Sequence, residues 1–136
     1  MEAAMAAKSK EDRPGYSITE VEDMTGITAH TIRYYDKCGF FPNLGRDSRG
    51  RRFFTDSDLQ QLTLIEALRY SGLSIEGIGY FVRMQLRGRD GVKQLMRVLS
   101  EQKLSLDLKM REIEECQGAL EAYASEIAQK AEISQV

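Results

Sequence analysis

The sequence predicts a mainly α-helical fold, in which a small N-terminal head (residues 15–88) is followed by one long helix. Two capping boxes, at Ser17 and Thr55, each open an apolar pattern with helical spacing. Turn residues and a short β-like run, Arg51 to Phe54, separate those two patterns. Beyond residue 90 an apolar residue recurs every seven positions. These observations predict short helices and a small wing in the head, and a coiled-coil helix behind it.

The first two helices are predicted to be short and adjacent. Ser17 starts the first helix, and Gly26 follows where that helix has to stop. Thr28 is placed to cap a second helix with Ile32 and Tyr35 on its inner face. Two short helices joined by a turn that contains glycine are the sequence form of a helix-turn-helix.

A wing and two further helices complete the predicted head. Turn residues from Asn43 to Gly50 precede the strand that ends at Phe54, so residues 43–54 form the wing. A third helix begins at Thr55 and ends near Gly72, and Ser74 caps a fourth. Their inner faces are predicted to comprise Leu59, Leu62, Ile65, Ala67 and Leu68, and then Ile75, Ile78, Phe81 and Val82.

The long helix carries a coiled-coil pattern, and such a helix needs a partner. A second position of the seven-residue repeat also faces the partner in a coiled coil, and here it is partly polar (Met96, Lys103, Met110, Gln117, Ala124). The polar residues weaken the helix pairing or specify its register. The alternative is an amphipathic helix folded back on its own domain. We expect self-association through the seam, which consists of Val92, Leu99, Leu106, Ile113, Leu120 and Ile127.

These patterns divide the 136 residues into four segments. Residues 1–14 mix alanine with charged side chains and are expected to form a flexible leader. The head follows at 15–88, the coiled-coil dimerisation helix at 89–130 and a tail at 131–136. The length does not leave room for two full domains.

Composition restricts the classes of function. Neither an apolar run of about 20 residues nor a secretory signal is present, so we expect a cytoplasmic protein without a membrane role. His30 is the only histidine, and Cys38 and Cys116 lie far apart in the sequence. We therefore expect no metal site, no cofactor and no catalytic centre, and the protein is not expected to be an enzyme.

Charge is unevenly distributed, although the net charge is only −2. Residues 28–54 hold six basic and two acidic side chains, whereas residues 100–136 hold four basic and eight acidic ones. A basic head can face phosphates, and an acidic helix would be repelled by them. This asymmetry favours double-stranded DNA as the partner of the helix-turn-helix.

The residues that favour DNA recognition lie at the start of the second helix and in the wing. Plainer roles are a helix cap for Thr28, a surface position for His30 and an internal ion pair for Arg33; the wing arginines could form an ordinary solvated turn. Of Tyr34 and Tyr35, one is expected in the core, while the other can offer its hydroxyl to a phosphate. The predicted DNA-binding residues are Ser17, Thr28, Ala29, His30, Thr31, Arg33, Tyr34, Tyr35, Arg46, Arg49, Arg51, Arg52 and Phe54.

Three motifs occur in a specific order: ITEVEDMTGITAHTIRYYDKCGFF, then RGRRFFTDSDL, then IEALRYSGLSIEGI. Over about residues 15–86 they resemble the MerR family of bacterial regulators. The resemblance implies a winged helix-turn-helix and an antiparallel coiled-coil homodimer. It further implies binding to a palindrome in an overlong promoter spacer, which the dimer bends and untwists for RNA polymerase. It also makes Arg33, Tyr34, Arg52 and Phe54 DNA-contacting or DNA-supporting, although Phe54 replaces the family's usual tyrosine.

The resemblance does not point to a particular signal. Metal-sensing members have a cysteine at the start of the dimer helix, where this chain has Val92 and Lys93; the thiol-stress branch often has one where this chain has Ala67. A thiol-sensor hypothesis remains for Cys38 and Cys116, and the favoured alternative makes both small buried side chains. The alternative functions are a constitutive or nutrient-responsive repressor, or a protein interaction module that does not bind DNA.

Overall fold

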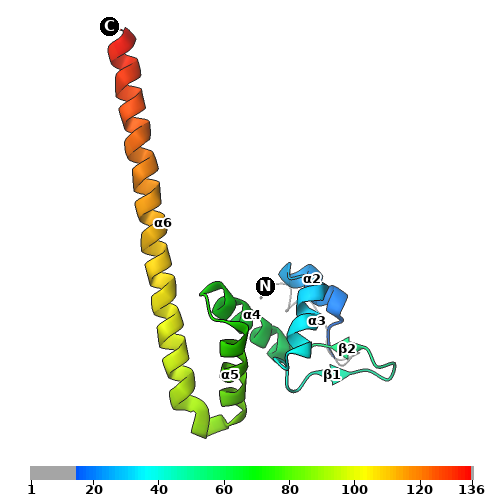
Figure 1. The fold of residues 1–136 in the computed structure, drawn as a ribbon. Helices are drawn as coiled ribbons and strands as arrows, with labels where there is room; N and C mark the ends of the chain where they lie inside the picture. The colour runs from blue at the N-terminus through cyan, green and yellow to red at the C-terminus, as the bar shows by residue number, and fades with distance from the viewer. Residues whose placement is uncertain (1–14, 136) are drawn as a thin grey trace.

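A computed structural model describes residues 15–135, with side chains described through residue 133. The head is joined at one end to a long straight helix (Figure 1). The fold is mainly helical with a small wing and a long C-terminal helix, which confirms the predicted fold class. The predicted leader, residues 1–14, lies outside the described residues.

The two helices of the helix-turn-helix begin and end where the sequence predicts. Helix α2 (Ile18–Thr25) starts at Ser17, whose hydroxyl and amide complete the capping box. It ends at Gly26, whose φ of 75° is one that side chains other than glycine rarely adopt. Helix α3 (Ala29–Lys37) starts at Thr28, whose hydroxyl accepts a hydrogen bond from the first turn.

The wing is a two-stranded antiparallel ribbon, shorter than predicted. Strand β1 (Gly45–Arg46) pairs with β2 (Arg52–Phe53). Phe54 leaves the ribbon and pairs instead with Tyr16, through two backbone hydrogen bonds of 2.7 and 2.8 Å. The segment before α2 is thereby tied to the base of the wing.

Helices α4 (Asp56–Tyr70) and α5 (Ile75–Leu86) form the other side of the head, and both are capped as predicted. The prediction that Ala67 faces inward is wrong, because Ala67 is exposed. It lies five residues after the buried Leu62, which at about 100° per residue turns its side chain away from the core.

The core lies between the helix-turn-helix and the α4–α5 pair. The rings of Phe41 and Phe54 meet edge to face there, with centroids 5.7 Å apart. Side chains from all four helices and from both ends of the wing close this one cluster. Its members are Tyr16, Val21, Ile32, Tyr35, Phe40, Phe41, Phe54, Leu59, Leu62, Ile65, Leu68, Ile78, Phe81 and Val82.

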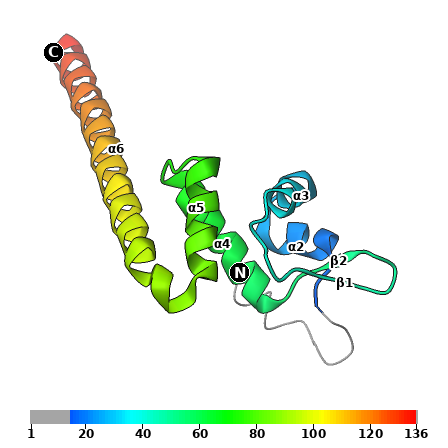
Figure 2. The same ribbon diagram turned by 60° about the horizontal axis from the view of Figure 1, so that its bottom comes forward.

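A short 3₁₀ turn, η1 (Gly88–Gly91), leads into helix α6 (Val92–Gln135), which is about 66 Å long at 1.5 Å per residue. Its first part contacts α5, and its second part extends away from the head in both views (Figures 1 and 2). Helix α6 starts three residues later than the predicted 89 and continues through most of the predicted tail.

The side chains of α6 from 110 to 133 lie outside the head, and all of them are exposed. The alternative that this helix folds back along its own domain is therefore wrong for its C-terminal half. Leu106 is half-buried, whereas the other seam residues are exposed. Among residues 15–135, none of the helices combines the length and the apolar character that crossing a bilayer requires.

Candidate nucleic-acid interface

Helix α3 turns one polar face outward. His30, Arg33, Tyr34 and Lys37 are exposed on it, and Arg33 and Lys37 are one helical turn apart. Within the described residues, neither His30 nor Arg33 forms an ion pair. The internal ion pair considered for Arg33 is therefore not formed, and its guanidinium is available to a ligand.

The start of α3 is held by two side chains that accept hydrogen bonds from its backbone amides. The Thr28 hydroxyl accepts from the Thr31 amide at 3.2 Å, so its predicted capping role is confirmed. A carboxylate oxygen of Glu22 in α2 accepts from the Ala29 amide at 2.6 Å. Glu22 thus fixes the angle of the turn. The sequence pattern did not predict this role, because the contact spans seven residues and depends on the geometry of the turn.

The tip of the wing is an ordered turn. The Asp47 carboxylate accepts from the amides of Arg49 and Arg51, both at 2.9 Å, and from Arg51 Nε at 3.1 Å. These contacts, led by the one from the Arg51 amide, lower the pKa of Asp47. Gly50 completes the turn with a φ of 79°. The tip therefore presents its arginines from a defined backbone.

Asp36 joins the wing to α3. Arg52 Nε donates to Asp36 Oδ2 at 2.6 Å, and Arg46 Nη2 lies 3.8 Å from the same oxygen. The Arg52 side chain is 25% exposed, and the Arg46 side chain is 54% exposed. Arg52 therefore acts mainly as a bracket at the base of the wing, whereas Arg46 remains more accessible. No role was assigned to Asp36 from the sequence, although it directly follows Tyr35 in the first of the three motifs.

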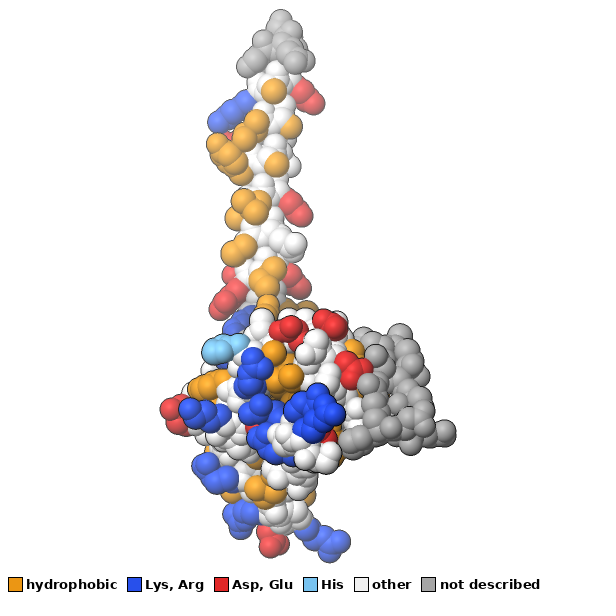
Figure 3. Space-filling model, turned by 90° about the vertical axis from the view of Figure 1, so that its right-hand side faces the viewer, with side chains coloured by type: hydrophobic (Ala, Val, Ile, Leu, Met, Phe, Trp, Pro, Cys, Tyr) orange, Lys and Arg blue, Asp and Glu red, His pale blue; other side chains and the backbone are white. Residues whose placement is uncertain are grey.

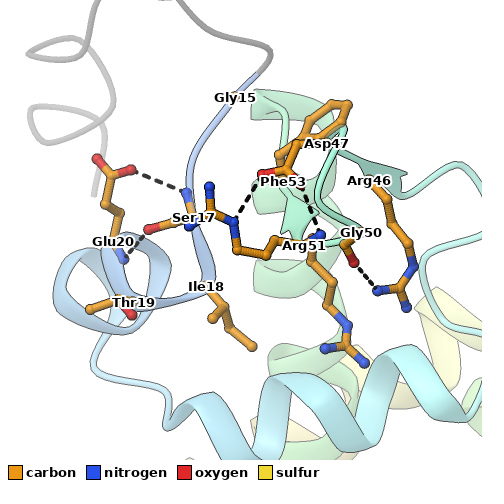
Figure 4. Close-up of a pocket in the computed structure, with 11 residues that line it drawn as sticks. Gly15, Ser17, Ile18, Thr19, Glu20, Arg46, Asp47, Gly50, Arg51 and Phe53 are labelled. Carbon is orange, nitrogen blue, oxygen red and sulfur yellow. Dashed lines mark hydrogen bonds and ion pairs between the residues drawn. The ribbon is translucent and has the colours of Figure 1, made fainter.

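Two open hollows flank the wing and bring predicted residues together. One lies between the start of α2 and the wing, with Ser17 and Glu20 on one side and Arg46 and Arg51 on the other (Figure 4). The other lies between α3 and the wing. Lysine and arginine side chains gather over this part of the head (Figure 3). The second hollow is lined by His30, Arg33, Tyr34, Asp36, Lys37, Arg46 and Arg52.

The predicted residues differ in accessibility. Tyr35 and Phe54 are 0% exposed, so the prediction that the Tyr35 side chain contacts DNA is wrong. Of the two roles predicted for Phe54, direct contact is excluded by its burial, and support of the interface from the core remains a prediction. The remaining predicted residues all reach the surface. Ser17, Thr28, His30, Arg33, Tyr34, Arg46, Arg49 and Arg51 are exposed, and Ala29, Thr31 and Arg52 are half-buried.

The two adjacent tyrosines have different environments. Tyr35 is the core member of the pair, and its hydroxyl donates to Glu66 at 2.7 Å and accepts from Arg69 Nη1 at 2.9 Å. Burial is the main reason why the pKa of Tyr35 is raised above 10.0. Tyr34 is 43% exposed, and its interaction with the neighbouring Cys38 side chain is the main reason why its pKa is raised. The Tyr34 hydroxyl can therefore reach a ligand, and the Tyr35 hydroxyl cannot.

Both cysteines are exposed and form no disulfide, so the favoured interpretation that they are buried is wrong. Cys38 caps the end of α3, and Cys116 lies on the outer part of α6. A sensing role for either thiol remains a prediction. In the described part of the chain no three metal-ligating side chains cluster together.

The head matches a family model described as MerR HTH family regulatory protein over residues 16–84. A helix-turn-helix-type transcriptional regulator from Haemophilus influenzae is 34% identical over 116 residues, which cover 85% of each chain. This chain belongs to the MerR family. The resemblance proposed from the sequence motifs is thereby confirmed, and the relatives are transcriptional regulators.

Solved structures of MerR-family regulators share the same fold. HiNmlR, a member that lacks the sensor domain and was solved on promoter DNA, has a TM-score of 0.76 and 34% identity. The match covers 86% of this chain and 92% of that one. A MerR-family regulator from Bacillus thuringiensis has a TM-score of 0.67 and 29% identity, over 84% of this chain and 97% of its own. The similarity therefore includes most of the long helix as well as the head.

Proposed function

We propose that this protein is a sequence-specific transcriptional regulator of the MerR type that binds a palindromic operator as a homodimer. One observation carries the proposal: the exposed face of α3 and the wing arginines lie side by side on one basic surface. The relative that was solved on promoter DNA has this fold and supports the same use of the head. A cytoplasmic location and the lack of a catalytic role belong to the same proposal.

In this proposal α3 is the recognition helix. His30 and Arg33 point outward from its first two turns, where a major-groove helix contacts base edges. The half-buried Ala29 and Thr31 place the backbone of the first turn close to the same groove. Thr28, Tyr34 and Ser17, with Arg46, Arg49, Arg51 and Arg52 of the wing, contact phosphates or the minor groove.

The seam of α6 supplies the dimer. Apolar side chains follow one another along the exposed helix (Figure 3), and a second copy is the partner that a seven-residue repeat fits. Charge favours an antiparallel arrangement. Residues 83–97 hold five basic and one acidic side chain, whereas residues 112–132 hold six acidic and one basic. Antiparallel pairing brings these segments together, and parallel pairing opposes like charges.

The dimer would act by changing the shape of promoter DNA. Two heads fixed to one helix pair contact both halves of a palindrome, and bending such a site costs about 1–6 kcal/mol, which the contacts must supply. Untwisting an overlong spacer in this way realigns the promoter elements for RNA polymerase. A repressor, constitutive or nutrient-responsive, would bind the same palindrome without untwisting it.

The proposal is tested by selecting DNA from a randomised library with the full chain and measuring affinity across a salt series. We expect a palindrome to emerge and its affinity to fall steeply as salt rises, because lysines and arginines displace counterions. Arg33→Ala should lower affinity for the selected palindrome by about tenfold, and Arg111→Ala on α6 should leave it nearly unchanged.

Other outcomes would favour the alternatives. Failure to enrich any DNA, together with negligible affinity for random DNA even at low salt, would support the protein interaction module. Plasmids that carry the palindrome in an overlong promoter spacer separate the remaining two functions. Protein binding should change their linking number after relaxation by topoisomerase, and an unchanged linking number would favour the repressor.

A further inference from the structure

The turn between α4 and α5 is fastened to α6 by polar contacts, which we call the latch (Tyr70, Ser71, Gln102, Ser105 and Lys109). Ser105 Oγ donates to the Ser71 carbonyl at 2.7 Å, and Lys109 Nζ donates to the Tyr70 carbonyl at 2.8 Å. Ser71 Oγ lies 2.8 Å from Gln102 Oε1. Ser71 is 2% exposed, so the latch extends into the packed junction between head and long helix.

The latch satisfies the end of α4. The last carbonyls of a helix lack partners within that helix, and they lie at the negative end of its dipole. Here α6 provides a hydroxyl from Ser105 and an ammonium from Lys109 to two of these carbonyls. The ammonium also lies 5.8 Å from the centre of the Tyr70 ring. These contacts are directional, so they are satisfied at only a narrow range of angles between α4 and α6.

A second fixed point lies at the elbow between α5 and α6. Gly91 is buried, and a Cβ there would come within 2.0 Å of the Met84 carbonyl oxygen, so the two backbones meet at the elbow. Gly91 and Lys109 are 18 positions apart, which is about 27 Å along a helix. Leu95 and Val98 pack against the core between these two points. The head is therefore attached to α6 at the elbow and again at the latch.

We propose that the latch is a positioning device, which sets the angle of each head on α6 and so the separation of the two recognition helices in the dimer. This inference rests on the proposed homodimer. None of its members is among the predicted DNA contacts, and the recognition helix lies at the far side of the head from α6 (Figure 1). A small rotation at the latch therefore produces a larger displacement at α3. The latch specifies the half-site spacing that the dimer accepts.

The native thiol of Cys38 reports on this angle, because it is exposed at the end of α3. In a Cys116→Ser background, a spin label on Cys38 gives the distance between the two heads of a dimer by pulsed electron paramagnetic resonance. The test variant is Ser105→Ala/Lys109→Met. Its control is Ser125→Ala/Arg111→Met, which likewise removes one hydroxyl and one positive charge, at exposed positions of α6.

We expect the parent and the control to share one narrow distance distribution, and the test variant to give a broader one. Palindromes selected by the unlabelled protein, with one base pair inserted or removed at the centre, provide a second measurement. Discrimination against the altered spacings should fall about fivefold in the test variant, since it loses directional contacts worth one or two ordinary hydrogen bonds. Lys109→Arg keeps a cationic donor and should retain most of the discrimination.

Three outcomes would overturn the inference in distinguishable ways. If the distance distribution between the heads of an intact dimer and the spacing discrimination are both unchanged, the latch does not position the heads. The proposal that the protein is a regulator is unaffected by this outcome. If no distance between two labelled heads is detected, both the proposed homodimer and the proposed role of the latch are contradicted. If the double variant loses helical circular dichroism, Lys109→Met alone is compared with Lys109→Arg, and equal distributions for these two contradict the positioning role.

Discussion

Tyr34 and Tyr35 show how neighbouring residues of one type acquire different roles. Adjacent positions in a helix point about 100° apart, so one ring of such a pair faces the core when the other faces solvent. The spacing of Ile32 and Tyr35 placed Tyr35 inward, while its basic surroundings placed it with the predicted DNA contacts. The structure supports the spacing, because Tyr35 is buried. Local periodicity was more reliable here than proximity to contact residues.

Tyr35→Phe should lower the free energy of unfolding by about 1–2 kcal/mol, because the buried hydroxyl bonds both Glu66 and Arg69. Urea denaturation followed by circular dichroism measures the change. Tyr34→Phe is the matched control, since it removes the same group from an exposed ring. If Tyr35→Phe lowers the free energy of unfolding no more than Tyr34→Phe does, the contacts of the Tyr35 hydroxyl with α4 contribute little to stability.

The raised pKa of Tyr35 predicts a loss of stability at alkaline pH. The folded protein holds this proton more tightly than the unfolded chain, whose tyrosines titrate near 10.0. The stabilisation is complete below pH 10 and disappears as pH rises through the folded pKa. Urea midpoints between pH 9 and 11 should therefore fall less steeply for Tyr35→Phe than for the parent. Tyr123→Phe, at an exposed position, should keep the parent's slope.

At the scale of elements, the sequence predicted what local chemistry determines. The starts of α2, α3, α4 and α5 follow from hydroxyl caps a few residues from the amides that they satisfy. The length of the wing could not be predicted in this way, because Phe54 pairs with Tyr16 across 38 positions of sequence. Likewise the contact of Asp36 with Arg52 depends on how the wing folds against α3. Such contacts have no local pattern.

Asp36→Asn should weaken operator binding by roughly threefold to tenfold, because the charge-assisted bond that holds the base of the wing is lost. Electrostatics alone predicts the opposite sign, since removing an acid from a DNA-facing surface should strengthen binding. Asp23→Asn, at an exposed position of α2, isolates that electrostatic effect and should strengthen binding slightly. Fluorescence anisotropy with the selected palindrome measures both. If both variants strengthen operator binding equally, the contact between Asp36 and Arg52 does not hold the wing in place for binding.

At the scale of the whole molecule, the seven-residue repeat predicted that the long helix needs a partner. The exposure of α6 from residue 111 to 133 agrees with an unpaired seam in the single chain. The sequence did not predict where α6 leaves the head or at what angle. Those features depend on Gly91 at the elbow and on the latch, whose members are 31 to 39 positions apart in sequence.

Leu120→Glu should separate the dimer, because it places a charge in the seam at a position that is 72% exposed in the single chain. Sedimentation velocity should show a monomer, with the head still folded because it does not contact this part of α6. Two linked heads bind a palindrome with a high effective concentration for the second contact, so operator affinity should fall by a factor of about 100 or more. Binding of each head to random DNA should remain.

Ala122→Glu adds the same charge at an exposed position two residues away, on a different face of the helix, and should stay dimeric. Two further cysteine variants, mixed after Cys38 and Cys116 are replaced by serine, determine the strand direction. Lys93→Cys and Glu126→Cys should form a disulfide with each other if the helices are antiparallel, since these positions are equally distant from the middle of the seam. A disulfide between two Glu126→Cys chains would instead show parallel helices and contradict the charge argument.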